Sequence, residues 1–108
     1  MSESLYPPFL KWGDYHSKDE KNPDVLKVEV LELELFETEF TTNIRAKVDG
    51  VEKIIPLYSF ESKNKQLFQK FNDAKKSGKI QVGKKFKILT WLGISKNNFP
   101  IRRFELVF

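Results

Sequence analysis

Few residues of this chain could carry out catalysis. It contains no cysteine and one histidine, His16, which lies in the polar stretch HSKDEKNPD. A thiolate metal site is therefore excluded, a two-histidine metal site cannot form within one chain, and a Ser-His-Asp triad in the core is not expected. The glycines are isolated, so no glycine-rich phosphate loop is present. We expect neither a metal ion nor another cofactor.

Carboxylates are the remaining catalytic candidates. Several glutamates stand close together in residues 29–39, and such groups can act as acid–base pairs or as ligands of hard cations. They are Glu29, Glu32, Glu34, Glu37 and Glu39. The apolar alternation between them changes phase, so they do not share one face, and solvated strand positions explain them better. The sequence predicts a protein that is not an enzyme, and catalysis by carboxylates is the third alternative after two binding functions.

Basic and aromatic side chains offer a different chemistry, the binding of polyanions. The net charge is +4 and uneven, because residues 64–108 carry 11 basic and 2 acidic side chains. A basic half can mark a surface for polyanions, although lysines that solvate a helix and its turns explain most of the run from Lys70 to Lys87. The informative residues are therefore cations that lie on strands and alternate with aromatic rings.

The longest of the strands that could position such residues is VLKVEVLELELFETE, residues 25–39. Its apolar residues occupy even positions up to residue 30 and odd positions from residue 31. One extra residue reverses which side chains face the core, so the sequence predicts a β-bulge at Val30–Leu31 that bends one long strand. A bent strand of this kind can pair in two sheets at once and so help to close a barrel. The alternative is one long amphipathic strand whose change of phase has no effect on the fold. The bulge predicts buried leucines at positions 31, 33 and 35, and exposed glutamates at 32 and 34.

A β-hairpin is predicted around Asp49-Gly50, because a type I′ turn needs positive φ at both central residues. A two-residue loop fixes the register of the strand 40–48 against the strand that follows. The predicted pairs are Val48 with Val51, Lys47 with Glu52, Arg45 with Ile54 and Ile44 with Ile55. The outward face then carries Asn43, Arg45, Lys47, Glu52, Ile54, Pro56 and Tyr58.

The rest of the chain predicts one helix and two further strands. Helical spacing covers residues 64–77, where Leu67, Phe68, Phe71 and Ala74 form an apolar stripe. The strands are residues 79–92 and 100–108, joined by the loop GISKNNF. On the second of these strands Arg102 faces the core near the loop end, where it is expected to reach solvent. Residues 1–24 are expected to form an irregular arm whose aromatic side chains pack rather than bind.

The order strand, strand, strand, helix, strand, strand resembles that of an OB-fold. The segment VGKKFKI, followed by a loop and a closing strand, is similar to small single-stranded-DNA-binding OB proteins of archaea, phages and bacteria. The resemblance covers residues 25–108 and implies an all-β domain with one helix, a five-stranded OB-fold Greek-key barrel, preceded by the arm and linker of residues 1–24. Two departures are expected: the chain is expected to lack the acidic tail of bacterial single-strand-binding proteins, and Glu37 and Glu39, in the loop after the first strand, would repel a phosphate backbone.

The resemblance implies binding of single-stranded nucleic acid, DNA in preference to RNA, with little dependence on sequence. Cations would follow the backbone, and aromatic rings would stack on bases. The predicted nucleic-acid-binding residues are Arg45, Lys47, Ile54, Tyr58, Trp91, Lys96, Phe99 and Arg103. Packing at the barrel end is the alternative role for the three aromatic residues. The alternative function is that of an OB-like protein–protein interaction subunit.

The location expected from the sequence is the cytoplasm. The segment MSESLYPPFLKW has no basic stretch followed by an apolar run, and no part of the chain approaches the roughly 18 apolar residues of a membrane span. The lack of cysteine fits a reducing compartment. The expected partners are nucleic acid and other proteins, without a membrane.

Overall fold

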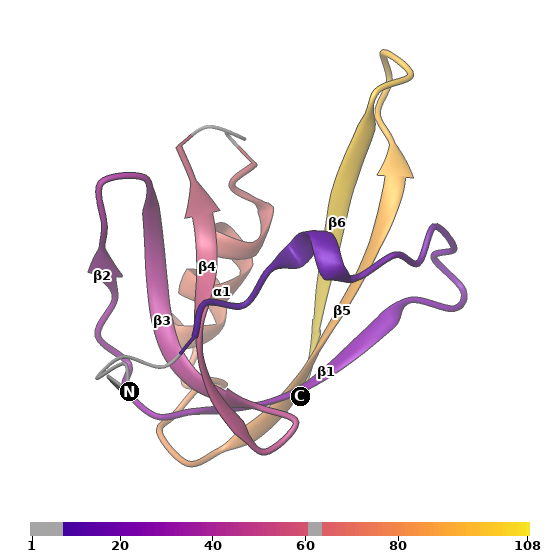
Figure 1. Cartoon of the computed structure of the whole chain (residues 1–108). Coiled ribbons are helices and arrows are strands. Elements are labelled where there is room, and N and C mark those ends of the chain that lie inside the picture. The colour runs from indigo at the N-terminus through magenta and orange to yellow at the C-terminus, as the bar shows by residue number, and fades with distance from the viewer. Residues whose placement is uncertain (1–7, 61–63) are drawn as a thin grey trace, which may run out of the picture.

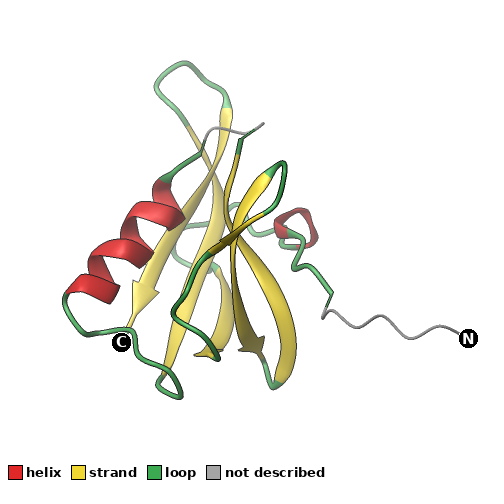
Figure 2. Ribbon diagram, turned by 90° about the vertical axis from the view of Figure 1, so that its left-hand side faces the viewer, coloured by secondary structure: helices red, strands yellow, loops and turns green. Residues whose placement is uncertain are grey.

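The computed structural model describes residues 8–60 and 64–108. In these residues the chain forms strands, one α-helix and a short 3-10 helix (Figures 1 and 2). The elements are η1 (Trp12–Asp14), β1 (Asp24–Val30), β2 (Phe36–Glu37), β3 (Thr41–Val48), β4 (Val51–Ser59), α1 (Gln66–Lys76), β5 (Lys85–Ile94) and β6 (Pro100–Val107). One antiparallel sheet runs in the order β2-β3-β1-β5-β6, and β4 also pairs with β3. The prediction of a mostly β protein with one helix is confirmed.

The prediction of one long first strand is wrong, because this part of the chain forms two strands, β1 and β2. Val30 pairs with Ala46 of β3, and Phe36 pairs with Asn43 of the same strand. Between these two pairs the chain advances by six residues on the β1–β2 side but by only three residues on β3. Three extra residues therefore loop out, where a bulge of one residue was predicted. Any odd number of extra residues reverses the alternation, which is why the two cases leave the same sequence pattern.

The loop between β1 and β2 lies at the margin of the core. Its leucines, including Leu33 and Leu35, are half-buried rather than fully buried, whereas Glu32 and Glu34 are exposed as predicted. The Lys75 ammonium at the end of α1 donates a hydrogen bond to the Leu33 carbonyl (3.0 Å). This contact ties the looped-out residues to the helix.

The β3–β4 hairpin forms with the predicted register. Asp49 and Gly50 have φ angles of 52° and 86°, as a type I′ turn requires. The ladder pairs Val48 with Val51, Lys47 with Glu52, Arg45 with Ile54 and Ile44 with Ile55. The register shifts between Thr42 and Asn43, beyond the predicted pairs.

Helix α1 lies where a helix was predicted, and its apolar stripe faces the core. Leu67, Phe71 and Ala74 are buried, and the helix packs against β4 and β6 on one side of the sheet (Figure 2). The Asn64 side chain accepts a hydrogen bond from the Gln66 backbone N–H (3.1 Å). The predicted strand 79–92 begins only at Lys85, because turns occupy the residues before it.

The sheet is not closed into a barrel. Within residues 8–60 and 64–108 no ladder joins β4 to β6, so the predicted five-stranded closed barrel is corrected to an open sheet of six strands. The arm occupies the edge of β4: the Ile54 N–H donates to the Pro8 carbonyl (2.9 Å), and the Ile54 carbonyl accepts from the Leu10 N–H (2.7 Å). The backbone groups of Ile54 are thus satisfied by the arm instead of β6. Residues 1–7 of the predicted arm lie outside the described residues.

Candidate nucleic-acid interface

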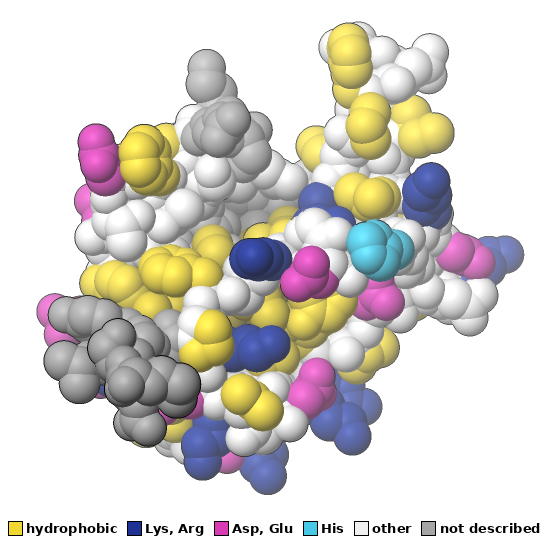
Figure 3. Space-filling view, viewed as in Figure 1, with side chains coloured by type: hydrophobic (Ala, Val, Ile, Leu, Met, Phe, Trp, Pro, Cys, Tyr) yellow, Lys and Arg dark blue, Asp and Glu magenta, His cyan; other side chains and the backbone are white. Residues whose placement is uncertain are grey.

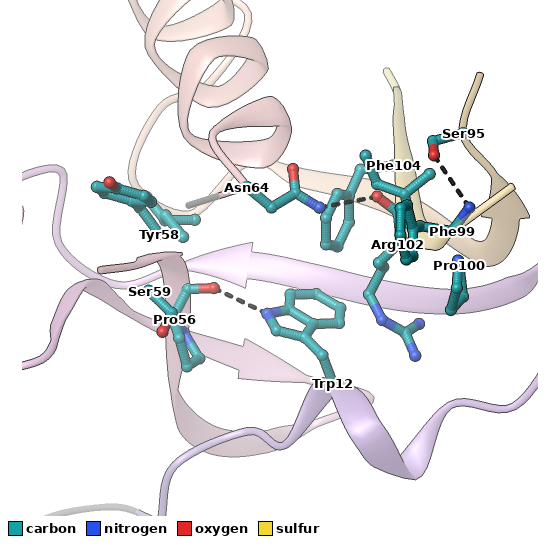
Figure 4. Close-up of a pocket in the computed structure, with 12 residues that line it drawn as sticks. Trp12, Pro56, Tyr58, Ser59, Asn64, Ser95, Phe99, Pro100, Arg102 and Phe104 are labelled. Atoms are coloured by element: carbon teal, nitrogen blue, oxygen red, sulfur yellow. Dashed lines mark hydrogen bonds between the residues drawn. The ribbon is translucent and has the colours of Figure 1, made fainter. Parts of the chain in front are cut away.

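A cleft lies between β4 and β6, where the sheet is open, and its cavity has a volume of about 520 Å³. The surface is hollowed between β4 and the projecting β5–β6 hairpin (Figure 3). We call this space the seam cleft. The residues that shape it come from the arm, β4, the segment before α1 and the hairpin, and they include Trp12, Tyr58, Asn64, Phe99, Arg102 and Phe104 (Figure 4).

Trp12 of the arm spans the gap between the two strands. Its indole Nε1 donates a hydrogen bond to the Pro56 carbonyl of β4 (2.8 Å). This carbonyl can accept the bond because β4 does not pair with β6. Its ring packs edge-to-face against Phe104 of β6, with centroids 4.9 Å apart and planes at 75°. An edge-to-face pair is a favourable aromatic geometry. One side chain therefore links β4 to β6 and forms part of the cleft surface.

Arg102 lines the cleft, where it is half-buried, so it reaches solvent only in part, and its guanidinium is held by the arm. Its guanidinium donates to the Thr90 hydroxyl (3.1 Å) and to the Tyr15 carbonyl (2.8 Å). Burial lowers the pKa of Arg102 from its ordinary value. The side chain therefore fastens the arm to β6.

Tyr58 forms the wall of the cleft on the β4 side. Its ring packs edge-to-face on Phe60, with centroids 5.3 Å apart, and the Lys65 ammonium lies 5.4 Å from its ring centroid. Asn64, at the same wall, donates a hydrogen bond to the Arg102 carbonyl of β6 (2.9 Å). Tyr58 thus presents a half-buried aromatic ring with a cation beside it.

Phe99 stands on the opposite wall, at the tip of the β5–β6 hairpin (Figure 4). It is 68% exposed. The tip is ordered by backbone hydrogen bonds from Ser95 to Phe99 (2.8 Å) and from Asn98 to Ser95 (3.0 Å), and Asn98 adopts a left-handed φ of 62°. Lys96 is exposed on the same tip. The hairpin therefore holds one uncovered ring and one cation beside the cleft.

Trp91 and Arg103 lie outside the seam cleft, where they face each other across the β5–β6 ladder. They line a second hollow of about 510 Å³, the outer groove, together with Gln66 and Lys70 of α1. A Cβ atom at Gly93 would lie 3.3 Å from the Arg103 Cγ, so this glycine leaves room for the arginine. Phe104 lines both hollows.

The predicted residues on the hairpin β3–β4 are not part of the cleft, with the exception of Tyr58. Arg45 forms ion pairs with Glu32 (2.9 Å) and with Glu52, and the hydrogen bond that it donates to the Glu52 carboxylate raises its pKa. Ile54 is only 3% exposed because the arm pairs with it, so its predicted position on an open face is corrected. Lys47 is exposed near the Asp49-Gly50 turn.

The structure thus brings Tyr58 and Phe99 together at the seam cleft and places Trp91 and Arg103 on the far side of the same hairpin. Sequence patterns missed Trp12 as a cleft residue, because the arm has no periodicity that would reveal its position, and they placed Phe104 on the core face of its strand without showing that the arm packs on it. The exposed Phe40 in the β2–β3 turn was missed as well. In the sequence Phe40 was the first residue of the predicted strand 40–48, and only its position beside the charged Glu39 suggested that it could be exposed.

Among the described residues, no group of three or more His, Cys, Asp or Glu side chains could hold a metal ion. No helix in residues 8–60 and 64–108 has the length and apolar character needed to cross a membrane. The class defined by the geometry is an open antiparallel β-sheet protein with one helix and an aromatic cleft. Comparison with protein-family models, curated proteins and solved structures finds no match for this chain.

Proposed function

We propose that this protein binds single-stranded nucleic acid in the seam cleft, and that its fold is an OB barrel opened at one seam. The strand order supports the fold. If β1 and β2 count as two halves of one strand, the sheet runs third, second, first, fourth, fifth in chain order. A Greek-key barrel cut between its third and fifth strands has this order, and OB barrels are often partly open. The hairpin tip and the β2–β3 turn then correspond to the loops that bind ligand in that fold.

The observation that carries the proposal is that two aromatic residues line one cleft from different elements, the half-buried Tyr58 of β4 and the exposed Phe99 of the β5–β6 hairpin. A base stacked on an aromatic ring contributes about 1–3 kcal/mol, whatever the base, because every base has a π-face. Lys65 beside Tyr58 and Lys96 beside Phe99 can pair with backbone phosphates. The two aromatic rings can stack on the unpaired bases of a single strand. The bases of a duplex are already stacked and paired, so they are not available to these rings. We therefore expect sequence-tolerant binding, with DNA as the proposed ligand and RNA as the alternative.

The test is fluorescence anisotropy with labelled oligothymidine, mixed-sequence single strands of DNA and RNA, and duplex DNA. Tyr58→Ala and Phe99→Ala should each weaken single-strand binding by about 1–3 kcal/mol, which is roughly 5- to 150-fold. Phe108→Ala is the matched control, because Phe108 is also an exposed phenylalanine but lies away from the cleft, stacked on Phe86. Equal affinity of parent, Tyr58→Ala and Phe99→Ala would contradict the proposal.

Protein–protein interaction is the second candidate, because two exposed apolar side chains flank the polar tip of the hairpin. Ile94 is 72% exposed beside Phe99, and Phe40 is exposed on the β2–β3 turn. Exposed apolar groups of this kind are typical of contact surfaces. Absence of oligonucleotide binding in the anisotropy experiment, at low as well as moderate salt, would favour this candidate over nucleic-acid binding.

A further inference from the structure

A third hollow lies at the end of the sheet away from the hairpin tip. It has a volume of about 430 Å³, and its lining includes Lys27 of β1, Lys47 of β3 and Lys85 of β5. Basic side chains gather along this lower end of the molecule in the view of Figure 3. We call this space the basic hollow.

The strand register explains why the lysines gather there. Glu29 of β1 pairs with Lys47 on one side and with Lys85 on the other. In the adjacent row Lys27 stands directly opposite Lys87. Neighbouring strands are about 4.8 Å apart, and alternate residues of one strand about 6.7 Å apart, so the lysines form a close cluster around one glutamate.

The cations of this cluster outnumber its carboxylates, because Lys27, Lys47 and Lys85 line the hollow together with Glu29 and Asp49. Two like charges directly opposite in a ladder are destabilising, as Lys27 and Lys87 are. The two ion pairs formed by the described part of the chain both belong to Arg45 and involve no lysine. Asp49 also lines the hollow and accepts a hydrogen bond from the Lys27 backbone N–H (3.2 Å), so one carboxylate remains beside the lysines. A bound anion would relieve this repulsion.

We propose that the basic hollow binds backbone phosphates of the same strand whose bases occupy the seam cleft; this rests on the proposed function. The alternation of β5 puts Lys85, Lys87 and Trp91 on one face of the sheet. Trp91 lies in the outer groove with Arg103, so a strand that leaves the cleft over the hairpin passes aromatic and basic groups on its way. A duplex is too wide and stiff to bend over the hairpin in this way. The proposed ligand is therefore one continuous single strand that contacts both sites.

The distance between the two sites sets a length requirement. From Trp91 to Lys85 is six residues along β5, or about 20 Å. Because the path over the hairpin from the cleft to Trp91 comes in addition, at about 3.4 Å per stacked nucleotide the strand needs at least roughly six nucleotides beyond those held in the cleft. An oligothymidine of about five nucleotides fills the cleft alone, whereas one of about 15 reaches the basic hollow.

The experiment compares both oligothymidines on the full chain, by anisotropy over a range of salt concentrations. The variant is Lys47→Gln/Lys85→Gln, and the matched control is Lys18→Gln/Lys76→Gln, which removes two exposed lysines that line none of the three hollows. We assume that each lysine neutralises one phosphate, which contributes about 0.7 to the slope of log affinity against log salt. The variant, which lacks two lysines, should then bind the longer strand about 25-fold more weakly at about 0.1 M salt. Its salt slope becomes shallower by about 1.4. Its affinity for the short strand equals that of the control.

Three results would overturn the proposal in different ways. Equal affinities of variant and control for the longer strand would reject the basic hollow and leave the cleft standing. An equal loss for both strand lengths would show a general charge effect rather than a phosphate site on an extended path. If the parent binds neither strand, both the basic hollow and the proposed function fail. Unchanged thermal unfolding of the two double variants establishes that folding is not the cause.

Discussion

Replacement of Trp12 should show how much stability the arm contributes by joining β4 to β6. Trp12→Phe keeps a ring against Phe104 but leaves the Pro56 carbonyl without its donor, at a cost of about 1 kcal/mol. Trp12→Ala also removes the packed ring. If the half-buried ring covers about 150 Å², then at about 25 cal/mol per Å² its loss adds about 3–4 kcal/mol. The loss of packing should therefore exceed the loss of the hydrogen bond.

The assay is urea unfolding followed by far-ultraviolet circular dichroism, which does not depend on tryptophan emission. The slope of free energy against urea should stay constant while the midpoint falls in the order parent, Trp12→Phe, Trp12→Ala. Phe99→Ala is the control, because its exposed ring should change the unfolding free energy by less than about 0.5 kcal/mol. If Trp12→Ala is as stable as Phe99→Ala, the arm does not hold the two edges together and this account of the open sheet is wrong.

Three further outcomes test the core, the hairpin and the arm. Phe71→Ala, at the buried face of α1, should lose about 3–5 kcal/mol of unfolding free energy, and a loss below about 1 kcal/mol in the same urea assay would contradict its place in the core. Gly50→Ala should cost about 1 kcal/mol, because a side chain is strained at its φ of 86°; equal or greater thermal stability would refute the type I′ turn. Burial raises the pKa of Tyr15 above its ordinary 10.0, so its contribution to stability is present below pH 10 and is lost as the pH rises through the folded pKa. An ultraviolet absorbance titration that places the Tyr15 midpoint at or below 10.0 would disprove that burial.

Local rules were enough to predict the β3–β4 hairpin and helix α1. The turn chemistry of Asp49-Gly50 fixes both the loop length and the register, so each cross-strand pair follows from two residues. The stripe that contains Leu67 and Phe71 likewise determines which side of the helix is buried. In both cases the information lies within a few residues of the structure it specifies.

The division of the first strand could be predicted only in part. A change of phase shows that an odd number of residues is inserted, but it cannot distinguish one from three. The choice depends on contacts from far along the chain, such as that of Lys75 with the Leu33 carbonyl. A period-2 pattern contains no information about such a contact.

The cleft could not be predicted, because the arm that shapes it has neither helical nor strand periodicity. Ile54 alternates as an outward residue should, yet the arm covers it. Arg102 was placed on the core side correctly, but its partners, Thr90 and the Tyr15 carbonyl, are known only once the arm is placed. Tyr58 and Phe99 come together for the same reason, through tertiary packing rather than through spacing in the sequence.

The central claim is that single-stranded nucleic acid occupies the seam cleft, and amide chemical shifts test it most directly. Titration of the nitrogen-15-labelled protein with an oligothymidine of about five nucleotides should shift the amide signals of Tyr58, Asn64 and Phe99 and the indole N–H of Trp12, which lines the cleft. Amides of the basic hollow, such as Lys47 and Lys85, should not move with this short strand. Unchanged spectra at saturating oligonucleotide, or shifts confined to residues outside the cleft, would contradict the account.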